Sequence, residues 1–87
     1  MTESQRVAEA EAFDAGLDRV KIALTTAGYG GWAQRITDAA LAGSTGSEIL
    51  FRVRGALIEA RNAVGPERSL IETLTTLIAQ VDRTLAV

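Results

Sequence analysis

The sequence predicts one all-α domain over residues 1–87, an antiparallel bundle of four helices at residues 3–27, 31–42, 45–64 and 66–86, the second of them short. Apolar residues recur at intervals of three and four along most of the chain, which is the period of amphipathic helices. Glycines interrupt this pattern at Gly28, Gly43 and Gly65, where helix ends are expected. A content of 47% hydrophobic and 23% charged residues is typical of a folded globular domain.

The helix over residues 3–27 is indicated by a heptad-like apolar seam formed by Ala10, Phe13, Leu17, Val20, Leu24 and Ala27. Glu11, Asp14 and Asp18 share another face, with Lys21 one turn later. Two functional interpretations exist, an acidic docking strip or a carboxylate pair for a hard cation. A cation site needs several oxygens from more than one element, so we interpret these residues as a solvated helix face.

The stretch from Gly28 to Gly31 predicts a tight turn before the second helix. It lacks both the G-x-G-x-x-G pattern and the P-loop lysine, so we do not interpret it as a phosphate site. Trp32 is expected to be a structural residue at the edge of the core, with ligand stacking as the alternative. The helix is indicated by the spacing of Trp32, Ile36, Ala39 and Ala40.

The helix over residues 45–64 begins with a capping box, in which the Thr45 side chain accepts from the Glu48 amide and the Glu48 carboxylate accepts from the Thr45 amide. Both residues are therefore predicted to be structural. Glu48 and Arg52 lie four residues apart in the order that favours a surface ion pair. The predicted core face consists of Ile49, Leu50, Val53, Ala56, Leu57, Ala60 and Val64.

A second apolar face on this helix is the unusual feature of the sequence. Phe51, Gly55 and Ile58 lie opposite the core face, and Arg54 and Arg61 border them. Glycine is costly inside a helix, so Gly55 suggests close approach by another backbone. Either a neighbouring helix of the same chain covers this face, or a second chain does. We take these five residues as the candidate interaction surface.

The helix over residues 66–86 follows Gly65, and Pro66 is expected in its first turn. Its polar side carries glutamate, threonine, glutamine and arginine residues. This is the most strongly amphipathic segment, and its spacing is typical of helices that pack at shallow angles in bundles. Its apolar face consists of Leu70, Ile71, Leu74, Leu77, Ile78, Val81 and Leu85.

The composition restricts the chemistry that is open to the chain. It has no Cys and no His, which removes cysteine nucleophiles, thiolate metal sites, the commonest general base and the commonest transition-metal ligand. We expect no catalytic, cofactor-binding or metal-binding residues and no small-molecule substrate. A net charge of −2 without a basic cluster argues against nucleic acid as a partner. The polar N-terminal stretch and the lack of a long apolar run argue against a membrane, so we expect a cytoplasmic protein.

Residues 29–60 contain a Trp, here Trp32, followed by G-S-x-x-[ST]-E-I-L, here Gly43 to Leu50, and an arginine-containing stretch from Arg52 to Leu57. This pattern resembles that of a group of small uncharacterised bacterial proteins. Some of those proteins lie near polymorphic toxin or contact systems, so the resemblance implies an immunity-like or accessory binding role. It implies no catalytic residues, and it marks Trp32, Glu48 and Arg52 as structurally defining positions.

Three classes of function follow. The leading hypothesis is a non-catalytic protein-interaction module that binds a partner or itself, with a dimer expected. The second is a purely structural homo-oligomer closed through the second face of the helix over residues 45–64. The third is a small helical enzyme of chorismate-mutase type, which uses Arg and Lys donors in place of His or Cys. Converging, inward-pointing arginines would favour that enzyme.

Overall fold

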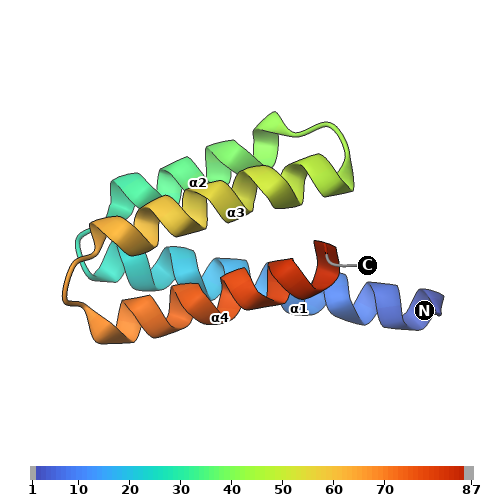
Figure 1. Cartoon of the computed structure of the whole chain (residues 1–87), viewed down its shortest axis with the longest axis horizontal. Helices are drawn as coiled ribbons and strands as arrows, with labels where there is room; N and C mark the ends of the chain where they lie inside the picture. Colours follow the sequence, from blue (N-terminus) through green and yellow to red (C-terminus); the bar gives the residue numbers. More distant parts are fainter. Residues whose placement is uncertain (1, 86–87) are drawn as a thin grey trace.

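The computed structural model describes residues 2–85, which form four helices and no strand. The helices are α1 (Glu3–Thr26), α2 (Gly30–Ala42), α3 (Gly46–Ala63) and α4 (Arg68–Leu85). The predicted all-α fold is confirmed, and each helix begins and ends within two residues of its predicted bound. Successive helices run antiparallel (Figure 1).

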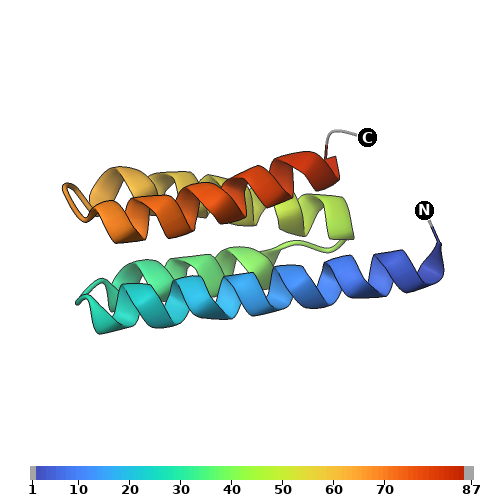
Figure 2. The same cartoon turned by 90° about the horizontal axis from the view of Figure 1, so that it is seen from below.

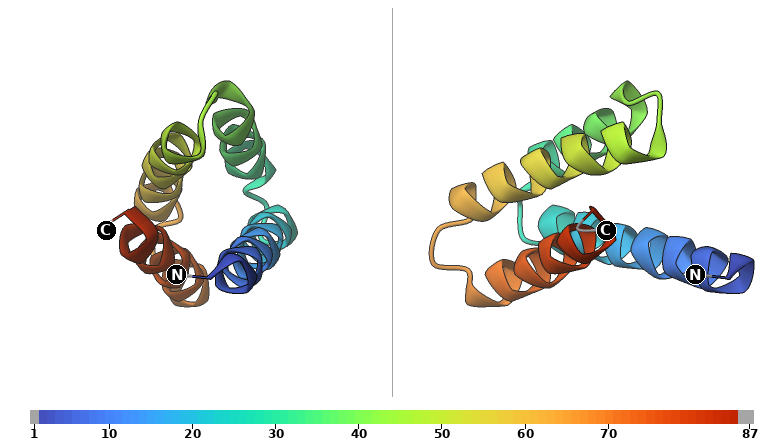
Figure 3. Two further views of the ribbon diagram at one scale, coloured as in Figure 1. Left: turned by 90° about the vertical axis from the view of Figure 1, so that its right-hand side faces the viewer. Right: turned by 45° about the vertical axis from the view of Figure 1, so that its right-hand side comes forward.

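The four helices form a ring in which each packs against two others. Helix α2 packs between α1 and α3, α3 packs between α2 and α4, and α4 closes the ring against α1. Figure 3 shows the ring end-on. The loops at one end are also joined, because the Tyr29 hydroxyl donates to the carbonyl of Val64 across 3.4 Å.

The core lies inside this ring and is entirely apolar among residues 2–85. The predicted core faces of α3 and α4 are confirmed, with Ile49, Leu50, Ile71 and Leu85 at their partly buried edges. Ala33 of α2 is buried although the sequence pattern did not single it out. The buried residues are Leu17, Val20, Leu24, Ala33, Ile36, Val53, Ala56, Leu57, Ala60, Val64, Leu70, Leu74, Leu77, Ile78 and Val81.

The predicted seam of α1 is too long. Leu17, Val20 and Leu24 are buried and Phe13 is half-buried, but Ala10 and Ala27 are exposed. Helix α1 has 24 residues against 18 in α4, and it reaches past the end of α4 (Figure 2). Ala10 lies in the N-terminal part of α1, and Ala27 lies in the turn that follows α1.

Two helix starts differ from their predictions. Pro66 lies in the turn before α4, not in the first helical turn, because the Glu67 amide donates to the Val64 carbonyl and closes a turn around Gly65. Gly65 has φ +58°, a conformation that suits glycine. At α1, Thr2 and Gln5 form a complete capping box that the sequence analysis missed, although the T-x-x-Q spacing signals it.

Within the described part of the chain, none of the helices has both the length and the apolar character needed to cross a membrane.

Candidate interaction surface on α3

The outer side of α3 carries an exposed aromatic residue beside an uncovered glycine. Phe51 is 62% exposed, and only Ile22 and Leu41 share this property among the large apolar residues described. Beyond the neighbouring backbone of α3 itself, a methyl group added at Gly55 would meet no atom of the described residues within 4 Å. The close backbone approach predicted at Gly55 is therefore not made by any helix of this chain.

Ile58, the third apolar residue of the predicted surface, is half-buried and packs against the core. The chain itself thus covers part of Ile58 but leaves Phe51 and Gly55 open. The alternative in which a neighbouring helix covers the whole second face is wrong for these two residues.

The two predicted arginines point away from this outer face, toward α4. Arg54 donates from Nε to Oδ1 of Asp82, and Arg61 donates from Nη1 to the Thr75 hydroxyl across 3.5 Å. Both arginines are half-buried. They belong to the contact between α3 and α4, so the structure separates them from Phe51 and Gly55.

Arg52 and Glu59 lie on the opposite flank of the face, and the sequence analysis did not place them in the surface. Both are exposed, and they line a shallow groove of about 510 Å³ between α2 and α3 together with Phe51 and Gly55. Arg35 and Asp38 of α2 form the far wall of the groove. The signal in the sequence is a pair of opposite charges, Arg52 and Glu59, two helical turns apart on the other edge of the second face.

Trp32 is half-buried and packs against the core, and the Arg35 guanidinium lies 4.6 Å from the centre of its ring. This placement matches the predicted position at the core edge. Arg35 therefore covers one face of the indole.

The N-terminus of α3 is capped by half of the predicted capping box. The Glu48 amide donates to the Thr45 hydroxyl across 3.2 Å, as predicted. The Glu48 carboxylate does not return to the Thr45 amide; it accepts from Arg52 Nε and from the Ser44 hydroxyl, each across 3.2 Å. The ion pair with Arg52 was predicted. The hydrogen bond from Arg52, followed by that from Ser44, lowers the pKa of Glu48.

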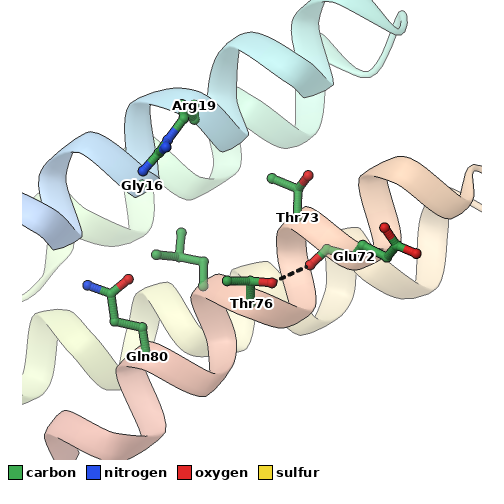
Figure 4. Close-up of a pocket in the computed structure, with 7 residues that line it drawn as sticks. Gly16, Arg19, Glu72, Thr73, Thr76 and Gln80 are labelled. Atoms are coloured by element: carbon green, nitrogen blue, oxygen red, sulfur yellow. Dashed lines mark hydrogen bonds between the residues drawn. The ribbon is translucent and has the colours of Figure 1, made fainter.

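A second groove, of about 400 Å³, lies between α1 and α4 (Figure 4). Its threonines are engaged by their own helix, since Thr76 donates to the Glu72 carbonyl and Thr73 to the Ser69 carbonyl, each across 2.9 Å. Gly16 forms part of it, and a methyl group there would lie 3.0 Å from Cδ1 of Leu77. Gly16 is the residue at which α1 and α4 come close together.

The acidic face of α1 is solvated. Glu11, Asp14 and Asp18 are exposed, and Lys21 lies 3.7 Å from Asp18. No group of three or more potential metal ligands gathers anywhere in residues 2–85. Converging buried arginines, the feature that would favour the enzyme hypothesis, are also not found in this range.

Comparisons of the chain with known protein families, with characterised proteins and with solved structures gave no match.

Proposed function

We propose that this chain is a non-catalytic protein-interaction module that binds through the outer side of α3. The single observation that supports the proposal is the exposure of Phe51 next to Gly55, which no other helix of the described residues covers. Burying an aromatic side chain at an interface contributes more binding free energy than most contacts, and a rigid helix presents it at low entropic cost.

The residues that we assign to this surface differ in part from the five predicted ones. Phe51, Gly55 and the exposed edge of Ile58 form its apolar part, and Arg52 and Glu59 form its charged rim. Arg54 and Arg61 contribute to the contact between α3 and α4. An apolar centre with a charged rim is the usual anatomy of a protein interface.

The specific role that we propose is an immunity-like or accessory protein of a bacterial toxin or contact system, acting in the cytoplasm. It is supported by the Trp32 and Gly43-to-Leu50 pattern and by the lack of Cys. The alternative of a purely structural oligomer uses the same surface, and it differs only in needing no foreign partner. The enzyme alternative is not favoured by any observation.

The proposal is tested with the purified chain and two variants of exposed apolar residues. Phe51→Glu places a charge on the proposed surface, and Ile22→Glu does the same on α1, where the residue is 65% exposed. We expect both variants to keep the circular dichroism of a helical protein. Solution mass by light scattering reports self-association, and affinity capture followed by reconstitution with the purified captured protein reports foreign binding.

We expect that at least one of these associations is present in the wild type, is lost in Phe51→Glu and persists in Ile22→Glu. An association that survives Phe51→Glu, or the lack of any association, contradicts the proposal.

A further inference from the structure

We infer that the partner of this surface is a second copy of the chain, which packs its own α3 antiparallel against this one about a two-fold axis near Gly55. The inference rests on the proposed function and specifies its partner. It follows from how four side chains are arranged around Gly55.

The four side chains form two pairs that each straddle Gly55. Phe51 and Ile58 are seven residues apart, as are Arg52 and Glu59, and seven residues are about two helical turns. At 100° per residue, Phe51 and Ile58 lie roughly 40° to 60° to one side of Gly55, and Arg52 and Glu59 lie roughly 40° to 60° to the other side. One flank is therefore apolar, and the other carries two opposite charges.

An antiparallel two-fold contact brings like flanks together. A residue that precedes the axis in the sequence of one copy then faces a residue that follows the axis in the other copy, and each such contact occurs twice. With Gly55 at the axis, Phe51 of each copy packs against Ile58 of the other. Arg52 of each copy faces Glu59 of the other in the same register.

The charges of the separate chain fit this arrangement. Arg52 pairs with Glu48 one turn earlier, but its side chain remains 51% exposed and faces solvent on the groove side. Among the side chains that the structure describes, no ion pair engages Glu59. In the dimer, Arg52 of one copy would pair with Glu59 of the other. Within a single helix these two residues lie too far apart to form an ion pair.

Gly55 accounts for how closely the two helices pack. Helix axes lie about 8 to 10 Å apart, and the smallest residue at the crossing gives the shortest separation. Apart from the neighbouring backbone of α3, no atom of the described residues lies within 4 Å of a methyl group placed at Gly55, so a second α3 has room to approach there. A foreign protein would also fit an open glycine, but only a second copy explains why both flanks are self-complementary.

The expected dimer is weak. One pair of helices buries less than the roughly 1,200 to 2,000 Å² of a standard interface, so the dimer should form in a concentration-dependent way. The sedimentation equilibrium of the full chain is therefore measured from low to high protein concentration, with circular dichroism on each variant.

The decisive test uses two single charge reversals. Arg52→Glu makes every rim contact between identical copies Glu against Glu, and Glu59→Arg makes every rim contact Arg against Arg. We expect each variant alone to raise the dimer dissociation constant by at least about tenfold. An equimolar mixture should restore dimerisation, because in the mixed dimer both contacts are again between opposite charges.

Gly55→Gln provides a second test that is independent of charge. The substitution improves helix propensity, so it should not unfold α3, but its side chain blocks the crossing point. We expect a helical monomer.

The outcomes separate the two proposals. A wild-type dimer that the mixture fails to restore overturns the register and the inference. A wild type that stays monomeric overturns the inference; the proposed function then stands only if a foreign protein binds in a Phe51-dependent way. A wild-type dimer that Phe51→Glu and Gly55→Gln leave intact overturns both the inference and the proposed function.

Discussion

Arg54 of α3 donates from Nε to Oδ1 of Asp82 in α4 across 2.5 Å and so joins two adjacent helices of the ring. The two side chains are 39% and 48% exposed. Water therefore screens the pair on one side. The Arg54 side chain therefore points toward α4 and not outward, and it belongs to the contact between α3 and α4.

We expect the Arg54–Asp82 pair to stabilise the fold only slightly. Exposed and half-exposed ion pairs typically contribute about 0.2 to 1 kcal/mol, even when their geometry is good. A double-mutant cycle with Arg54→Gln and Asp82→Asn, measured by urea unfolding, should give a coupling free energy in this range. The coupling should shrink in 1 M NaCl, because salt screens exposed charges. A coupling well above about 2 kcal/mol would show that the pair is effectively buried.

A second prediction concerns Gly43, in the loop between α2 and α3. A methyl group there would lie 2.7 Å from the backbone nitrogen of Ile49 and 2.8 Å from its Cα, so backbone atoms would have to move. We expect Gly43→Ala to lower the free energy of unfolding by about 1 to 3 kcal/mol, the usual cost of overpacking. The midpoint of thermal unfolding reports the change.

Gly46→Ala is the matched control, since Gly46 lies three residues away with no atom within 4 Å of an added methyl group. It should be neutral or stabilising, because alanine favours the helix that begins there. Equal losses in the two variants would mean that the loop needs glycine for a reason other than the contact with Ile49.

The glycines show how far the sequence predicts this structure. The helices and their core faces follow from the three-and-four spacing of apolar residues, which is a local property. Close approach is not local: it occurs at Gly16, against Leu77, and at Gly43, against Ile49, whereas Gly55 is open. The sequence alone places a glycine on a helix, but the packing of the other helices decides what lies opposite it.

The sequence predicts only part of the candidate surface, because the surface also depends on how the other helices pack. Helical spacing correctly puts Phe51 and Gly55 on the outer side of α3. It cannot tell whether an arginine at the edge turns outward or toward a neighbouring helix. Arg54 turns toward α4 because Asp82 lies there, and nothing in the sequence of α3 itself encodes that position.

A third prediction separates the two faces of α3. Leu57 is fully buried, so Leu57→Ala should cost about 2 to 5 kcal/mol through lost burial and the cavity that remains. Phe51→Ala should change the stability of the separate chain by no more than about 0.5 kcal/mol, since the side chain is mostly exposed. Urea unfolding at low protein concentration, where self-association is suppressed, gives both values. If the two costs are similar, Phe51 is a core residue and no interaction surface exists on this face.

The last prediction concerns the pH dependence of the N-terminus of α3. Hydrogen bonds from Arg52 and Ser44 favour the charged carboxylate, so the pKa of Glu48 is lower in the folded chain than its ordinary value of 4.5. A lowered pKa means that the unfolded chain binds the proton more readily. The stabilisation is therefore fully present above pH 4.5 and is lost as the pH falls through the folded pKa.

Titration of the Glu48 side-chain carboxyl by NMR measures this shift directly. The hydrogen bond from Arg52 is the larger cause, so Arg52→Gln should raise the pKa of Glu48 further toward its ordinary value than Ser44→Ala does. Glu48→Gln, which has no proton to bind at this position, should remove this part of the acid dependence while Thr45 still caps the helix. If Ser44→Ala has the larger effect, the loop before α3 holds the carboxylate and the contact with Arg52 is incidental. Arg52 would then be free to turn toward a partner without any cost to the start of the helix.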